Sequence, residues 1–155
     1  MLEALLLTIL IVLVVTAWLL RGWWGRRRGA ARAARARRSL AAHLERLEQE
    51  FLRAAAASGK PRGLTWAQCN FHDEVLLAHD RATGDVYALR AVTIRFEAVA
   101  GGDMEEVEAV GNLRYATAVF VYRRRRWTTD GRAIFNLGPQ ETLEKYRESL
   151  VPLTA

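Results

Sequence analysis

Cys69 and His72 come closest in this sequence to a reactive pair. They are three residues apart, and His79 and Asp80 follow in the next apolar run, so a catalytic Cys/His pair or a metal site is conceivable. A structural zinc site normally takes four ligands at regular spacings, and here Cys69 is the single cysteine. We therefore expect Cys69 to act as a buried apolar residue, and we predict no catalytic residue, no metal and no cofactor.

The acidic run at 103–108 is a second segment whose residue types suggest metal binding. It lacks the alternating aspartates and the final glutamate of an EF-hand loop. The sequence also contains no phosphate-binding glycine loop, no nucleophile elbow and no dinucleotide fingerprint. We expect the run to be a solvated turn, and the sequence gives no positive indication of an enzyme.

Arginine is concentrated in two places. Eight arginines stand between residues 21 and 38, in a chain of formal net charge +6. Beside an apolar segment they would fix topology and contact anionic lipid headgroups, so we expect such lipids as partners and do not expect nucleic acid. A second run, 123–126, precedes Trp127. Because neighbouring side chains of a strand point to opposite faces, we expect this run to be a hairpin end in solvent, with lipid headgroups as the next interpretation.

The segment 4–20 is apolar and free of charge. Its 17 residues reach about 26 Å as a helix, against a hydrocarbon core of about 30 Å. Basic residues follow this segment and none precede it, a pattern that keeps the basic flank in the cytoplasm. We predict a single-pass helix in a cell inner membrane, with the N-terminus outside and the C-terminal domain cytoplasmic. The predicted membrane-interface residues are Trp18, Arg21, Trp23, Trp24, Arg26, Arg27 and Arg28.

Two further segments connect this helix to the domain. The Arg-rich segment 21–38 is either a continuous helix or a flexible tether, and Gly25 and Gly29 favour a break. The segment 39–59 is predicted to be an amphipathic helix. Its apolar positions are Leu40, Leu44, Leu47 and Phe51. Their spacing of four, three and four residues permits a short coiled coil and a homodimer, whereas the alternative is a helix that packs on its own domain or lies along the membrane.

Residues 62–151 are predicted to form one α+β domain. Short β-like runs separated by turns indicate a curved antiparallel sheet of about five strands, including a hairpin turn at 80–85. In the run after this turn the apolar positions change from odd to even numbers, so we expect a bulge near Arg90. Pro139 opens a C-terminal helix whose apolar positions Leu143, Tyr146 and Leu150 should pack on the sheet.

The concave face of such a sheet is the predicted location of a pocket. Its aromatic candidates, which would equally serve as ordinary core, are Trp66, Tyr87, Phe96, Tyr115 and Phe120. The function we expect is that of a membrane-anchored protein whose cytoplasmic domain is a protein-interaction or accessory module. The alternatives are a binder of a small apolar ligand or lipid in the concave face, and an enzyme centred on Cys69 and His72.

Overall fold

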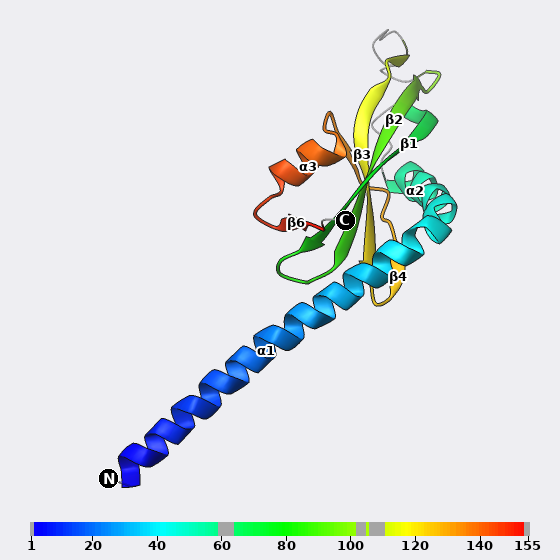
Figure 1. Ribbon diagram of the computed structural model, residues 1–155. Helices are drawn as coiled ribbons and strands as arrows, with labels where there is room; N and C mark the ends of the chain where they lie inside the picture. The colour runs from blue at the N-terminus through cyan, green and yellow to red at the C-terminus, as the bar shows by residue number, and fades with distance from the viewer. Residues whose placement is uncertain (1, 59–63, 102–104, 106–110, 154–155) are drawn as a thin grey trace.

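The chain is an α+β protein whose helices pack on both faces of a sheet. The computed structural model describes residues 2–58, 64–101, 105 and 111–153, except for the side chains of 2–11 and 21–28. Figure 1 shows α1 running away from the sheet toward the N-terminus, with α2 and α3 on opposite sides of the strands. The elements in chain order are α1 (Leu2–Leu40), the 3₁₀ turn η1 (Ala41–His43), α2 (Leu44–Ser58), β1 (Leu64–Asp80), β2 (Val86–Ala98), β3 (Arg114–Arg123), β4 (Arg126–Thr128), β5 (Ala133–Phe135), α3 (Pro139–Lys145) and β6 (Leu150–Pro152).

The predicted transmembrane helix is wrong, and with it the membrane-anchored part of the predicted fold, the topology and the inner-membrane location, whereas the predicted α+β class and antiparallel sheet are confirmed. The apolar segment 4–20 is only the first part of α1, which continues through the arginines to Leu40. Among the described residues, no helix combines the length and the apolar character that crossing a membrane requires. A span needs roughly 20 apolar residues. The run of 17 at the start of α1 is shorter, and charged residues follow it.

The helical segment changes direction at Ala41–His43, not at Gly25 or Gly29. A glycine costs a helix only about 1 kcal/mol relative to alanine, and the alanines and arginines around both glycines are strong helix formers. At the 3₁₀ turn, Nδ1 of His43 lies 2.7 Å from the carbonyl oxygen of Ser39. The turn redirects the chain so that α2 lies across the sheet.

The sheet has six strands in the order β4-β3-β2-β1-β6, with β5 also paired to β3, and every pair is antiparallel. The turn expected at 80–85 joins β1 to β2. The Asp80 carboxylate accepts hydrogen bonds from the backbone N–H groups of Ala82 and Thr83, at 2.9 and 2.8 Å. These bonds lower the pKa of Asp80. Gly84 provides the positive φ of 67° that the turn requires.

The irregularity expected near Arg90 belongs to β1 instead. The register of β1 against β2 shifts between Trp66 and Gln68 and again between Phe71 and Val75, whereas β2 pairs with β3 in unbroken register. Two strands predicted separately are therefore one long, bulged strand. The apolar positions of β2 change parity for a different reason: this strand is central and buried on both faces.

The main core lies between the sheet and the two long helices. The predicted coiled-coil seam faces this core: Leu47 and Phe51 are fully buried, and Leu40 is nearly so. They pack against alternate residues of β2 and β3, such as Val92 and Phe120. The residues of this seam are therefore part of the core of their own domain.

A smaller core lies on the other face, under α3. Leu89 and Val119 from the central strands pack there with Leu143 of α3 and Leu150 of β6. Leu150 was expected on the helix, but α3 ends at Lys145 and Leu150 begins a short strand that pairs with the end of β1. The sheet is therefore covered on both faces in its central part.

The end of α1 is held to the domain by polar contacts. A guanidinium nitrogen of Arg32 donates to the carbonyl oxygen of Gly84 at 2.7 Å. The indole N–H of Trp127, which is buried, lies 3.3 Å from the carbonyl oxygen of Ala36 and 3.1 Å from Oγ of Ser39. Residues about 90 positions apart thus fix the direction in which α1 leaves the domain.

Candidate binding surface

The five predicted pocket residues lie on two faces of the sheet. Trp66, Phe96 and Phe120 belong to the main core. The ring centroid of Phe51 lies 6.1 Å from that of Trp66 and 6.1 Å from that of Phe120, and Trp66 and Phe96 are 5.2 Å apart. These three residues act as core, which is the ordinary role that such an aromatic set has.

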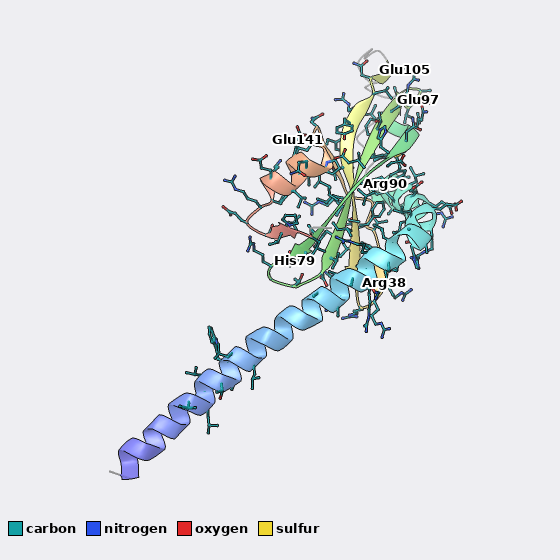
Figure 2. The ribbon with its side chains drawn as sticks, in the orientation of Figure 1. Arg38, His79, Arg90, Glu97, Glu105 and Glu141 are labelled. Atoms are coloured by element: carbon teal, nitrogen blue, oxygen red, sulfur yellow. The ribbon has the colours of Figure 1, made fainter. Side chains whose placement is uncertain are left out.

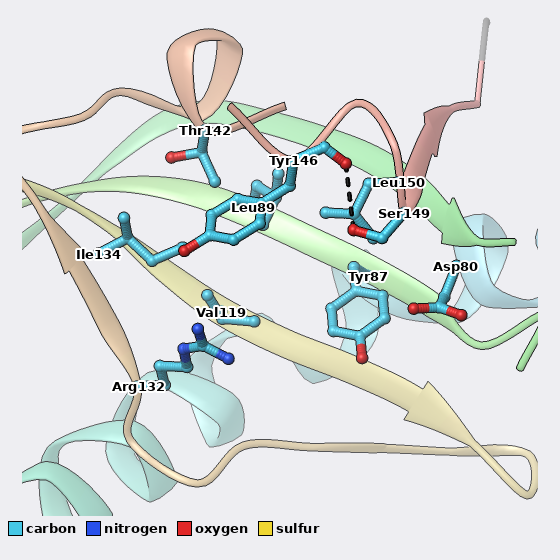
Figure 3. A pocket seen from close by; sticks show the side chains of 10 residues that line it. All are labelled: Asp80, Tyr87, Leu89, Val119, Arg132, Ile134, Thr142, Tyr146, Ser149 and Leu150. Carbon is cyan, nitrogen blue, oxygen red and sulfur yellow. Dashed lines mark hydrogen bonds between the residues drawn. The ribbon is translucent and has the colours of Figure 1, made fainter. Parts of the chain in front are cut away.

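Tyr87 and Tyr115 lie on the α3 face instead. Tyr87 lines a cavity of about 170 Å³ between the sheet and α3, together with Arg132 and Tyr146 (Figure 3). Ligand pockets usually enclose about 300–1,000 Å³, so this cavity is small for a ligand site. Burial raises the pKa of Tyr87, and Asp80 and Asp85 raise it further. Tyr115 is 42% exposed, and its hydroxyl lies 3.4 Å from a carboxylate oxygen of Glu74.

Cys69 and His72 do not form a reactive pair. Cys69 is half-buried and packs against the main core, where burial, together with the nearby Glu48, raises the pKa of its thiol to about 12. The His72 ring lies on the opposite face, with Nε2 2.6 Å from Oγ1 of Thr93. No group of three or more metal-ligating side chains occurs among the described residues.

The predicted membrane-interface residues are all on α1. Trp18 is 72% exposed. The side chains of Arg21, Trp23, Trp24, Arg26, Arg27 and Arg28 lie outside the described residues. The acidic run at 103–108 also lies outside them, except for Glu105. Lipid contact at the arginine segment therefore stays a prediction.

The most open part of the sheet is the outer side of β1. On this side β6 pairs only with Ala78–Asp80, and the N–H of Leu153 donates to the carbonyl oxygen of Leu77 at 2.8 Å. From Leu64 to Leu76, no described strand lies beside β1 opposite β2. We call this stretch the open edge. At the other side of the sheet β3 is covered by both β4 and β5, so the two sides differ.

Backbone groups of the open edge point outward. In an antiparallel ladder the hydrogen-bonded positions alternate, and Leu77 and Arg81 bond toward β6. By the same alternation the N–H and C=O groups of Val75 face away from β2. These outward groups are the template to which a further strand adds.

An apolar ledge runs along the open edge on the side of the helices. It consists of half-buried side chains that reach the main core from β1: Leu64, Trp66, Cys69, Phe71, Val75 and Leu77. On α2, Leu44 and Leu52 stand one turn to either side of Glu48 and form the rim above the ledge. Leu52 is 37% exposed. The open edge therefore carries a strip of partly exposed apolar side chains on the face where α2 packs.

An ion pair joins α2 to the sheet beside the apolar ledge. Arg90 is 8% exposed, lies between the sheet and α2 (Figure 2), and is paired with the carboxylate of Glu48. Its Nε also donates to the carbonyl oxygen of His72 at 2.7 Å, and its guanidinium lies 5.3 Å from the ring centroid of Phe71. The pair holds α2 over the bulged part of β1.

A cavity of about 550 Å³ lies beside the open edge, near the end of β6. Its lining includes Val75 and Leu76 of β1, Leu40 of α1, Leu143 of α3 and Leu153. Val75 faces the main core and Leu76 faces α3, so the cavity spans the edge of the sheet and not only one face. A strand that continues the track of β6 along β1 would occupy this space.

The sequence did not predict this surface. The sequence reads as two strands, 64–69 and 74–79, instead of one bulged strand, and nothing local shows on which side β1 lacks a neighbour. The half-buried alternation of the ledge was visible only in part, because the first register shift reverses its parity and the second interrupts it with two extra residues. Comparison with known proteins adds no assignment, since no protein family, no curated protein and no solved structure matches the chain.

Proposed function

We propose that the folded domain is a protein-interaction module that binds an extended segment of a partner protein along the open edge of β1. The observation that supports this most directly is the unpaired edge of β1 beside the half-buried apolar ledge. An added strand would satisfy outward backbone groups, and its alternate side chains would cover the apolar ledge. This mode of recognition needs no catalytic residue, metal or cofactor.

The two sides of the edge define the chemistry of the partner segment. Side chains that point toward α2 would meet Phe71, Val75 and the exposed Leu52, so they should be apolar. Side chains that point the other way would pass the exposed carboxylates of Asp73 and Glu74, so they should be basic or neutral polar. The expected ligand is therefore an extended segment with apolar and basic residues in alternation.

Selection from a phage-displayed library of random peptides on the full chain tests this proposal. Binding of a selected peptide is then measured by calorimetry, with hydrogen exchange of the β1 amides as a second readout. We expect alternating apolar and basic residues in the selected peptides, and slower exchange at Val75 when peptide is bound.

The substitution Val75→Pro removes one outward N–H and leaves the ladder to β2 intact, because proline is tolerated where the N–H of an edge strand faces solvent. It should weaken peptide binding by roughly tenfold or more, the effect of losing one backbone hydrogen bond and some of the ledge. The variant Asp73→Lys, in the exposed bulge, keeps the edge and should selectively weaken peptides with basic residues. Binding that is unchanged in both variants, with unchanged exchange in β1, would place the peptide elsewhere and refute the proposal.

A further inference from the structure

The turn between β3 and β4 holds two arginines in an unfavourable backbone conformation. Arg123 pairs with Arg126, so Arg124 and Arg125 are the two central residues of the hairpin. Both have positive φ, 50° and 65°. Such turns normally use Asn-Gly or Gly-Gly because a Cβ is disfavoured there. The run 123–126 is therefore an exposed hairpin end, as expected, although its two middle residues form the turn itself and not a strand.

Helix α1 brings further arginines to this turn. A cavity of about 340 Å³ between α1 and the turn is lined by Arg32, Arg35, Arg124 and Arg125 over the ring of Tyr122. The adjoining cavity of about 260 Å³ is lined by His43, Arg46, Arg125, Arg126 and Trp127, with Tyr122 and Ser39. The two cavities share Arg125 and Tyr122, so they form one continuous depression. We call it the arginine groove.

Four of these arginines have no counter-charge. Arg32 is paired with Asp85 at 3.7 Å, and Arg46 with Glu50 at 2.7 Å. In contrast, the exposed side chains of Arg35, Arg124, Arg125 and Arg126 make no hydrogen bond and no ion pair within the described part of the chain. Basic side chains gather where the C-terminal part of α1, marked by Arg38, passes β4 (Figure 2). Mutual repulsion disfavours this arrangement, and a bound anion would relieve the repulsion.

We propose that the arginine groove binds a compact anion that carries adjacent phosphate groups, such as inorganic polyphosphate or the phosphate chain of a nucleotide. Guanidinium groups match phosphate oxygens with paired hydrogen bonds, and several of them facing one depression suit several phosphates. The aromatic residues of the groove are unsuited to single-stranded nucleic acid. Tyr122 and Trp127 are only 6% and 2% exposed, so they offer no face on which bases could stack.

The arginine groove is independent of the open edge, which is proposed to bind a peptide. It lies along β3 and β4, whereas the open edge belongs to β1, and β2 separates the two in the sheet. Both surfaces use contacts of the helices with the sheet, but no side chain is common to the two. The failure of one proposal therefore leaves the other standing.

Isothermal titration calorimetry of the full chain with sodium tripolyphosphate tests the proposal. We expect saturable binding that weakens as sodium chloride is added, because the contacts are ionic. The single variants Arg35→Gln and Arg125→Gln should each weaken binding by about tenfold, the effect expected for loss of a charge-assisted hydrogen bond. Circular dichroism before each titration establishes that the variants are folded. ATP in a parallel titration distinguishes the sources, since tighter binding than tripolyphosphate indicates a nucleotide and equal binding indicates the phosphate chain alone.

The matched control is Arg147→Gln, which removes the same charge from an exposed position just after α3, on the other face of the sheet. It should leave the affinity unchanged. An equal loss in the control would show that only net charge matters and would overturn the proposal. Tighter binding of an oligothymidylate than of tripolyphosphate would also overturn it, in favour of single-stranded nucleic acid.

Discussion

Replacing Arg124 and Arg125 together by glycine should make the protein more stable and remove its anion binding. A residue with a Cβ in the left-handed region is disfavoured by roughly 1–2 kcal/mol. Glycine avoids this strain but gives back about 0.5–1 kcal/mol through the greater freedom of the unfolded chain. With two strained positions, at φ of 50° and 65°, the net gain should be about 1–2 kcal/mol. Both side chains are exposed, so little packing is lost.

Thermal unfolding followed by circular dichroism measures this gain. For a chain of this length, 1 kcal/mol shifts the midpoint by about 2–4 °C, so the midpoint should rise by about 2–8 °C. The matched control replaces Arg124 and Arg125 by glutamine, which removes the same charges and keeps the strain. It should lose tripolyphosphate binding like the glycine variant, but without the full rise in the midpoint.

The two variants separate strain from charge. A midpoint below that of the parent chain in the glycine variant would show that the arginine side chains stabilise the turn, and the argument from strain would be refuted. Undiminished tripolyphosphate binding in both variants would refute the role of the turn in the arginine groove. The pair of results therefore tests whether this turn gives up stability for binding.

Three further predictions concern the packing of α2 on the sheet. Glu48→Gln leaves a buried guanidinium without its counter-charge and should lower the free energy of unfolding by about 3 kcal/mol in urea denaturation, whereas Glu50→Gln on the same helix should change it by less than about 0.5 kcal/mol. Gly131→Ala should destabilise more severely and impair folding, because its Cβ would lie 2.3 Å from the backbone nitrogen of Ala55 at a φ of 77°. Burial raises the pKa of the Cys69 thiol from 9.0 to about 12. The free energy that the buried, protonated thiol contributes to folding is therefore fully present below pH 9.0 and is lost as the pH rises toward about 12. In melting curves recorded at increasing pH, the Cys69→Ala variant should lose less stability above pH 9.0 than the parent chain. An equal loss in the two proteins would contradict the burial of the thiol.

Local patterns predicted the features that neighbouring residues determine. The turn at 80–85 follows from Asp80 and Gly84, and the start of α3 follows from Pro139 and from Glu141, whose carboxylate accepts the N–H of Gly138 at 2.7 Å. The end of α3 was misjudged, because Leu150 continues the spacing of Leu143 in the sequence. Tertiary contact with β1 places it in a strand instead.

Features that depend on contacts between distant segments could not be predicted from local patterns. An apolar stretch of 17 residues resembles a membrane span when it is considered alone, although the helix to which it belongs continues through the arginines. The predicted pocket failed to assemble because Tyr87 and Tyr115 are odd-numbered residues of β2 and β3, which face α3, whereas Phe96 and Phe120 are even-numbered residues of the same strands and face the main core. The arginine groove joins α1 to a turn almost 90 residues later, and the charge of either segment alone gives no sign of the other.

The position of the arginine groove has a consequence for α1. Arg35 is on α1 and Arg124 is in the turn between β3 and β4, so an anion held between them would cross-link α1 to the hairpin that carries Trp127. Binding that requires the docked arrangement stabilises it by RT ln(1 + [L]/Kd), about 2.7 kcal/mol at a hundredfold excess over Kd. The exposed first part of α1 moves with its docked end, because the helix is continuous through Leu40. Occupancy of the groove would thus hold α1 more firmly in the direction in which it leaves the domain.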